Sequence, residues 1–148
     1  MKQLMFKSLA IFVATCSLVM AENTWNEDFE VAKAAAAKEK KLILMNVTGS
    51  DVCDRSAISE KTIFSQKEFK DFAKDNLILF NLDFPNVKPQ SGKIEKQHEE
   101  LAKKLKLEAY SQFMLLDAEG NRVETALRSG GAVEFVADLK ELLAKAKK

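Results

Sequence analysis

The sequence predicts an α/β fold in which helices cover both faces of a central β-sheet. Two unbroken apolar runs, "KLILMNV" and "NLILFNLDF", have the length and the residue types of strands that are buried on both faces. The segments around them place apolar residues at helical spacing, most strongly in "KIEKQHEELAKKLKL". Helices and strands that alternate along a chain are typical of a sheet with right-handed crossovers.

The pattern begins with an alanine-rich helix over residues 25–40. Asn26 is placed to cap this helix, and Trp25 is placed to anchor its packing. The first strand spans residues 41–47, and a further helix is expected from Cys53 to about Thr62. These assignments place a cysteine between the end of a buried strand and the start of a helix.

The rest of the chain continues the alternation. A capping box of Ser65 and Glu68 predicts the start of another helix. A second buried strand follows, then the amphipathic helix, then two strands joined as a hairpin by the tight turn "AEGN", and a last helix. Their expected ranges are 76–84 for the strand, 93–107 for the helix, 111–117 and 122–128 for the hairpin, and 132–147 for the last helix. The phenylalanines at positions 64, 69, 72, 80 and 84 are assigned to the core.

The first 21 residues have the features of a secretory signal peptide. A basic start is followed by the apolar run Leu9–Val13 and by "VMA", a small-residue cleavage pattern that ends at Ala21. We therefore expect an exported protein, periplasmic or secreted, with one domain over residues 22–148. An alternative is a lipoprotein anchored through Cys16, which Thr15 disfavours because threonine is a poor residue before an anchor cysteine.

Composition excludes several classes of function. Removal of residues 1–21 takes away two lysines and no acidic residue, so 21 basic and 22 acidic side chains remain. This near-neutral balance argues against a nucleic-acid partner. The remaining chain has one cysteine, Cys53, and one histidine, His98, so neither a zinc site nor another metal site is expected. No glycine-rich phosphate loop is present, and no cofactor is expected.

Cys53 lies in the sequence Cys53-Asp54-Arg55-Ser56, a C-x-x-S arrangement. A cysteine at a helix N-terminus faces unpaired backbone N–H groups and the positive end of the helix dipole, and both stabilise a thiolate. Arg55 and the Ser56 hydroxyl act in the same direction, whereas the carboxylates of Asp51 and Asp54 oppose it. The residues alone do not settle the sign of the net pKa shift, although they favour a modest lowering.

Six short motifs in one register resemble the thioredoxin-like superfamily, and in particular an exported bacterial thioredoxin-family branch. They are "WNEDFEVA", "TGSDVCDRS", "IFSQKEF", "LDFP", "AYSQFMLLD" and "DAEG". The resemblance spans the whole predicted domain and implies a thioredoxin fold, with a central mixed β-sheet flanked by helices on both faces. It also implies thiol–disulfide chemistry at Cys53.

The chain departs from the family pattern at four positions. The second cysteine of the family motif falls on Ser56, the tryptophan before the first cysteine on Val52, and the proline of the G-x-P-T strand on Ser111. A buried acid that many thioredoxins have six residues before the cysteine is replaced by Val47. Because a cis peptide bond before a residue other than proline costs about 2.5–4 kcal/mol, we expect a trans bond between Tyr110 and Ser111.

The resemblance assigns a role to each candidate site residue. Cys53 is the expected catalytic nucleophile, Ser56 a hydrogen-bond donor to its sulfur, and Tyr110 with Ser111 a part of the groove that binds clients. Thiol–disulfide exchange needs a second thiol to release the mixed disulfide, and a serine cannot supply it. A monothiol site therefore fits disulfide isomerisation, or exchange that uses small thiols, rather than unaided two-electron reduction.

Three other hypotheses follow from the same residues. The chain could be a redox-inactive binding or chaperone-like module that kept the fold and lost the chemistry. It could also form a disulfide-linked homodimer through Cys53. His98 lies on the same helical stripe as Ile94, Leu101 and Leu105, which indicates a boundary or part-buried residue rather than a catalytic base. The expected partners are client proteins that carry thiols or disulfides.

Overall fold

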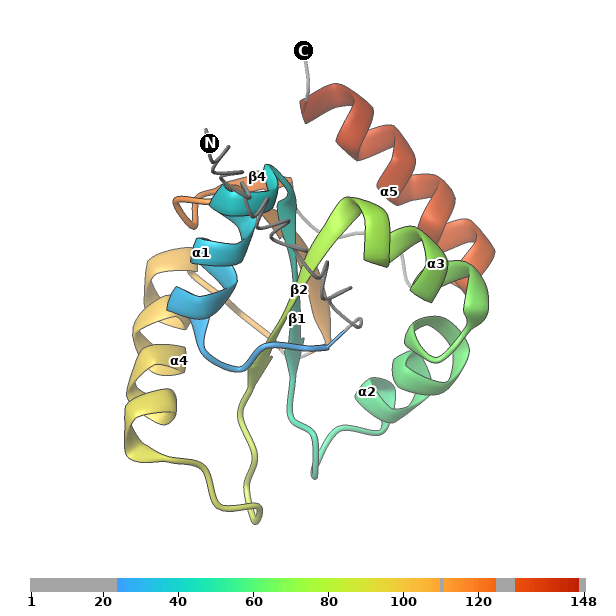
Figure 1. Cartoon of the computed structure of the whole chain (residues 1–148). Helices are drawn as coiled ribbons and strands as arrows, with labels where there is room; N and C mark the ends of the chain where they lie inside the picture. The colour runs from blue at the N-terminus through green and yellow to red at the C-terminus, as the bar shows by residue number, and fades with distance from the viewer. Residues whose placement is uncertain (1–23, 110, 125–129, 147–148) are drawn as a thin grey trace, which may run out of the picture.

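A four-stranded mixed β-sheet forms the centre of the structure, a computed structural model that describes residues 24–109, 111–124 and 130–146 (Figure 1). The strands are β1 (Leu42–Thr48), β2 (Leu77–Asp83), β3 (Gln112–Leu116) and β4 (Arg122–Glu124), in the order β2-β1-β3-β4. β1 pairs in parallel with β2 and antiparallel with β3, which pairs antiparallel with β4. The predicted sheet and hairpin are confirmed, whereas the predicted signal peptide and residues 125–128 of the fourth strand lie outside the described residues.

Helices cover both faces of this sheet, as predicted (Figure 1). α1 (Phe29–Glu39) and α4 (Gly92–Leu105) pack on one face. The other face carries α3 (Lys67–Asn76), α5 (Ala132–Ala146) and the π-helical turn η1 (Glu60–Phe64), which follows directly from α2 (Asp54–Ser59). Among the described residues, no helix combines the length and the apolar character that a membrane span requires.

β1 and β2 are apolar along nearly their whole length because both faces of the sheet are covered. In β1, Leu44 packs into the core under α3 and α5, while Ile43 and Met45 pack under α1 and α4. Phe64, Phe69 and Phe80 are buried as predicted, and Phe72 and Phe84 are partly buried at the edges of the two cores.

The start of the first helix differs from the prediction. Asp28, not Asn26, caps α1, since its carboxylate accepts a hydrogen bond of 3.0 Å from the backbone N–H of Glu30. Asn26 instead pairs with β2, donating its backbone N–H to Leu79 O (3.0 Å) and accepting from the N–H of Asn81 (2.8 Å). Pairing with the sheet holds Asn26 in extended backbone, so the helix begins later.

Trp25 also packs elsewhere than predicted. Its ring lies 4.9 Å from the ring of Phe64 and 6.5 Å from that of Phe69, on the face opposite α1. Trp25 therefore anchors the segment before α1 to the α2–α3 side of the molecule, rather than anchoring α1 itself.

The predicted capping box of Ser65 and Glu68 is wrong. The Ser65 hydroxyl donates to the Glu60 carboxylate (3.1 Å), and its backbone N–H donates to Glu60 O, which closes the π-helical turn. Ser65 thus has helical backbone angles and belongs to the end of η1, and α3 begins after Gln66. The helix predicted after Cys53 is confirmed, but its second half is this π-helical turn.

Candidate functional site

Cys53 lies at the carboxyl end of β1, on the loop that leads into α2. The loop is a tight turn in which Gly49 O accepts the backbone N–H groups of Val52 (3.1 Å) and Cys53 (2.9 Å). Cys53 has extended backbone angles and is the N-cap residue of α2, and its carbonyl accepts the N–H of Ser56 (3.0 Å). The side chain of Cys53 is half-buried.

The side chain of Ser111, the residue just before β3, lies next to the Cys53 sulfur. β3 runs antiparallel to β1, so the residue just before β3 lies at the carboxyl end of β1. The backbone N–H of Ser111 donates to Val47 O (2.8 Å), and its φ of 59° is in the left-handed region. In this position the Ser111 hydroxyl lies 3.1 Å from Cys53 Sγ.

The Ser56 hydroxyl completes the cluster, 3.3 Å from the Ser111 hydroxyl. The structure therefore brings three of the four predicted site residues together: Cys53, Ser56 and Ser111. Tyr110, and with it the bond between Tyr110 and Ser111, lies outside the described residues. Sequence reasoning placed Ser111 in a client groove and missed its contact with the sulfur, because no local pattern links residues 58 positions apart.

This environment lowers the pKa of the Cys53 thiol to about 7. The largest cause is the hydrogen bond from the Ser111 hydroxyl, followed by the Ser56 hydroxyl and the backbone N–H groups of Ser56 and Arg55. Burial acts against these effects but does not outweigh them. The net shift of the Cys53 pKa, whose sign the sequence did not settle, is therefore downward and favours the thiolate.

The carboxylate of Asp51 is engaged by a neighbouring loop. It accepts backbone N–H groups from Asn86 (2.8 Å), Val87 (2.6 Å) and Lys88 (2.8 Å). These bonds hold the pKa of Asp51 below its usual value. They also tie the loop after β2 to the loop that carries Cys53, a role that sequence reasoning missed when it considered only the charge of Asp51.

A second carboxylate fixes the same loop. Asp83 accepts the backbone N–H of Ser50 (2.8 Å) and the hydroxyl of Ser50 (2.6 Å), and its side chain is buried. Asp83 thus holds the loop that carries Cys53 against β2. Val47, where the family pattern has an acid, is 1% exposed in the apolar core under α1 and α4.

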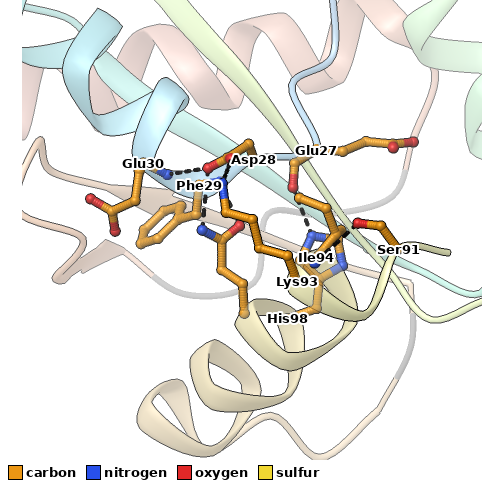
Figure 2. A network of polar contacts seen from close by, with 9 residues as sticks. Glu27, Asp28, Phe29, Glu30, Ser91, Lys93, Ile94 and His98 are labelled. Atoms are coloured by element: carbon orange, nitrogen blue, oxygen red, sulfur yellow. Dashed lines mark hydrogen bonds and ion pairs between the residues drawn. The ribbon is translucent and has the colours of Figure 1, made fainter.

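His98 is more deeply buried than the predicted boundary position, with no exposed surface. Its ring nitrogens lie 2.9 Å from the carbonyl oxygens of Asp83 and Glu27, and the second of these contacts is drawn in Figure 2. The same figure shows Lys93 next to Asp28, where the N-termini of α1 and α4 meet in an ion pair of 2.7 Å. His98 therefore has a structural role, joining α4 to two other segments.

No group of three or more histidine, cysteine, aspartate or glutamate side chains is placed to hold a metal ion within residues 24–109, 111–124 and 130–146. The chemistry that this site supports is that of a single, partly ionised thiol with two serine hydroxyls beside it.

Comparisons with known proteins agree with this architecture. Residues 24–118 match the model of the protein family described as "Thioredoxin-like". Over 126 residues the chain is 27% identical to the disulfide bond reductase DsbH of Chlamydia pneumoniae, which covers 84% of this chain and 76% of that protein.

Solved structures show the same fold. A DsbH oxidoreductase matches with a TM-score of 0.76 and 25% identity, covering 93% of this chain and 95% of that chain. The reduced C-terminal domain of DsbD from Neisseria meningitidis matches with a TM-score of 0.57 and 19% identity, covering 76% and 91%. A thioredoxin from Thermus thermophilus matches with a TM-score of 0.58 and 14% identity, and the match covers 78% of this chain and 84% of that chain. The predicted thioredoxin fold is confirmed.

Proposed function

Because the chain belongs to the thioredoxin-like family, we propose that it is an exported protein that carries out thiol–disulfide exchange with client proteins through Cys53 alone. The hydrogen bond of 3.1 Å between Cys53 Sγ and the Ser111 hydroxyl supports this most directly. With its pKa lowered to about 7, the Cys53 thiol is substantially ionised at neutral pH. The thiolate is the form that attacks disulfides.

In the proposed reaction, the Cys53 thiolate attacks one sulfur of a client disulfide. A bond forms between Cys53 Sγ and that sulfur, the client disulfide breaks, and its other sulfur leaves as a thiolate. A thiol of the same client then attacks the client sulfur of the adduct, and Cys53 leaves as a thiolate. This cycle rearranges disulfides without net electron transfer, whereas net reduction needs external thiols to supply two electrons.

Ser56 cannot release the adduct, because its hydroxyl does not form the disulfide that a second cysteine would form. The similarity to a protein named disulfide bond reductase supports the reaction type. The direction of exchange in this chain depends on the thiols that its surroundings provide.

Three exposed apolar side chains support a protein client. Val52, Ile58 and Val87 are 52%, 59% and 80% exposed. Val52 precedes Cys53, Ile58 lies on α2, and the backbone of Val87 is held by Asp51 next to Val52. Val52, as the residue before the thiol, would favour partners with apolar residues near their own cysteines. We propose that Tyr110 and Ser111 also contact the client.

The proposal predicts that Cys53 forms a covalent adduct. The purified chain is incubated with a peptide disulfide at neutral pH and analysed by mass spectrometry of the intact protein. We expect an adduct at Cys53 on the native chain and on Ser56→Ala, located by peptide mapping so that any adduct at Cys16 is counted separately. Cys53→Ser should carry no adduct at position 53 and should retain the fold by circular dichroism. Ser56→Cys is the complementary variant, since its new thiol should release the peptide and leave an internal disulfide. A native chain that forms no adduct would refute the exchange proposal.

A second candidate function is a redox-inactive module that binds clients without covalent chemistry. The observation in its favour is Val47, a buried apolar residue at the position where the family pattern has an acid that assists proton transfer. If the chain is such a module, Cys53→Ser should still suppress the aggregation of an unfolded client. If it acts by thiol–disulfide exchange, Cys53→Ser should lose its activity. Non-reducing electrophoresis of the native chain tests the disulfide-linked homodimer in the same samples.

A further inference from the structure

We propose that Ser111 is the positioning residue that stabilises the Cys53 thiolate, and that it acts together with Ser56 as one hydrogen-bond relay. The two serines replace the proline and the second cysteine of the family pattern, at positions 55 residues apart. The relay concerns the ionisation of the thiol and holds whether or not clients are exchanged; its use in catalysis rests on the function proposed above.

The backbone holds the Ser111 hydroxyl at the sulfur. Its N–H donates to Val47 O at 2.8 Å, and Gln112, the next residue, already pairs with Val47 in the sheet. Ser111 has a φ of 59°, a conformation that residues other than glycine rarely adopt. A proline could not adopt this angle, because its ring fixes φ, and it could not donate to Val47 O, because it has no backbone N–H. The left-handed backbone thus allows the side chain to point at Cys53 Sγ, 3.1 Å away.

The charge on the sulfur determines the direction of the hydrogen bonds. A thiolate has no proton and only accepts, so the Ser111 hydroxyl must donate to Cys53 Sγ. Each hydroxyl has one proton and two acceptor positions. The Ser56 hydroxyl lies 3.3 Å from that of Ser111, so we assign its proton to Ser111 rather than to the sulfur itself, and Ser56 then lowers the pKa of the Cys53 thiol through Ser111. A protonated thiol allows the opposite direction, from Cys53 to Ser111 to Ser56. Hydrogen bonds in such a chain polarise one another, and the two serines should therefore act cooperatively.

The relay matters for release as well as for attack. When a thiol attacks the client sulfur of the adduct, the bond between that sulfur and Cys53 Sγ breaks. The electron pair of the broken bond stays on Cys53 Sγ, which leaves as a thiolate. The Ser111 hydroxyl is placed to donate to the resulting thiolate. A better-stabilised thiolate leaves faster, so the serines favour release by an outside thiol where no second cysteine is available.

The test is the pKa of Cys53, measured from the thiolate absorbance near 240 nm as a function of pH. The Cys53→Ser variant is the blank, and it also removes any contribution from Cys16. We expect Ser111→Ala and Ser111→Gly to raise the pKa by roughly one unit, and Ser56→Ala to raise it by less. Ser111→Gly is the matched backbone control because glycine adopts a φ of 59° without strain.

Two outcomes would overturn the proposal. An unchanged pKa in Ser111→Gly would show that the hydroxyl does not stabilise the thiolate, even if Ser111→Ala shifts the pKa through its backbone. Shifts that add up in the double variant, Ser56→Ala with Ser111→Ala, would show that the serines act separately; we expect the double variant to shift less than the sum. The failure of exchange is a different result, because a native chain with these pKa shifts and no adduct retains the relay and loses the proposed function.

Discussion

At the scale of single residues, the chemistry of Cys53 depends on side chains that its own segment does not contain. The sulfur has its strongest partner in Ser111, the residue just before β3. Asp51, which sequence reasoning counted against the thiolate, accepts three backbone N–H groups from the loop after β2. Those N–H groups stabilise its charge locally, and Asp51 orders the site rather than simply opposing ionisation.

The lowered pKa of Cys53 predicts that stability rises with pH. The folded chain releases the thiol proton near pH 7, while the unfolded chain holds it to a higher pH, so in between the unfolded chain binds more protons. The stabilisation is complete above the unfolded pKa and is lost as the pH falls through about 7. Urea titrations at about pH 6 and pH 9 should show a growing difference in free energy of unfolding between the native chain and Cys53→Ser. A constant or shrinking difference would contradict the shift.

At the scale of elements, the sequence predicted the helices and strands well and their starts less well. Asn26, Asp28, Ser65 and Ser91 are all residues of the type that caps helices, and only Asp28 and Ser91 do so. Asn26 is drawn into pairing with β2 and Ser65 into a π-helical turn. These contacts involve partners that local propensity does not include, so the competition between neighbouring capping residues could not be resolved from the sequence.

The turn between β3 and β4 provides a test at this scale. Gly120 has a φ of 82°, and a Cβ added to it would lie 2.8 Å from Cζ of Phe29 in α1. We expect Gly120→Ala to lower the free energy of unfolding by about 1–3 kcal/mol, because of both the strained backbone and the clash. Gly92→Ala is the control, since a Cβ at Gly92 meets nothing within 4 Å. Urea denaturation of both variants should separate them, and equal stabilities would contradict this account.

At the scale of the whole molecule, the sheet could be predicted because β1 and β2 are apolar on both faces. The site could be predicted only in part. The spacing of Cys53 and Ser56 is local and visible in the sequence. The contact with Ser111 depends on the register in which β3 pairs with β1, where Val47 faces Gln112. No run of residues encodes that register, so the partner of the sulfur emerged only from the assembled sheet.

His98 links three parts of the molecule and gives the prediction at this scale. Its ring joins α4 to Glu27 before α1 and to Asp83 at the end of β2. His98→Leu preserves much of the volume but removes the ring N–H that a backbone carbonyl accepts, at a cost of about 1–3 kcal/mol for a carbonyl left buried without a donor. We expect a clear loss of stability in urea denaturation. Glu99→Ala, an exposed neighbour on α4, should change stability by less than about 0.5 kcal/mol; a similar small effect for His98→Leu would refute the linking role.

The short bridge at Asn26 has a consequence for solubility. β2 lies at the edge of the sheet, where free backbone groups of a strand can pair with a second molecule. Asn26 occupies Leu79 O and the N–H of Asn81 in the middle of that edge. A chain from which residues up to and including Asn26 are removed would expose the backbone groups of β2, an apolar strand that could then pair with β2 of a second molecule. Self-association is then the expected defect, together with the loss of the packing of Trp25 on Phe64 and Phe69.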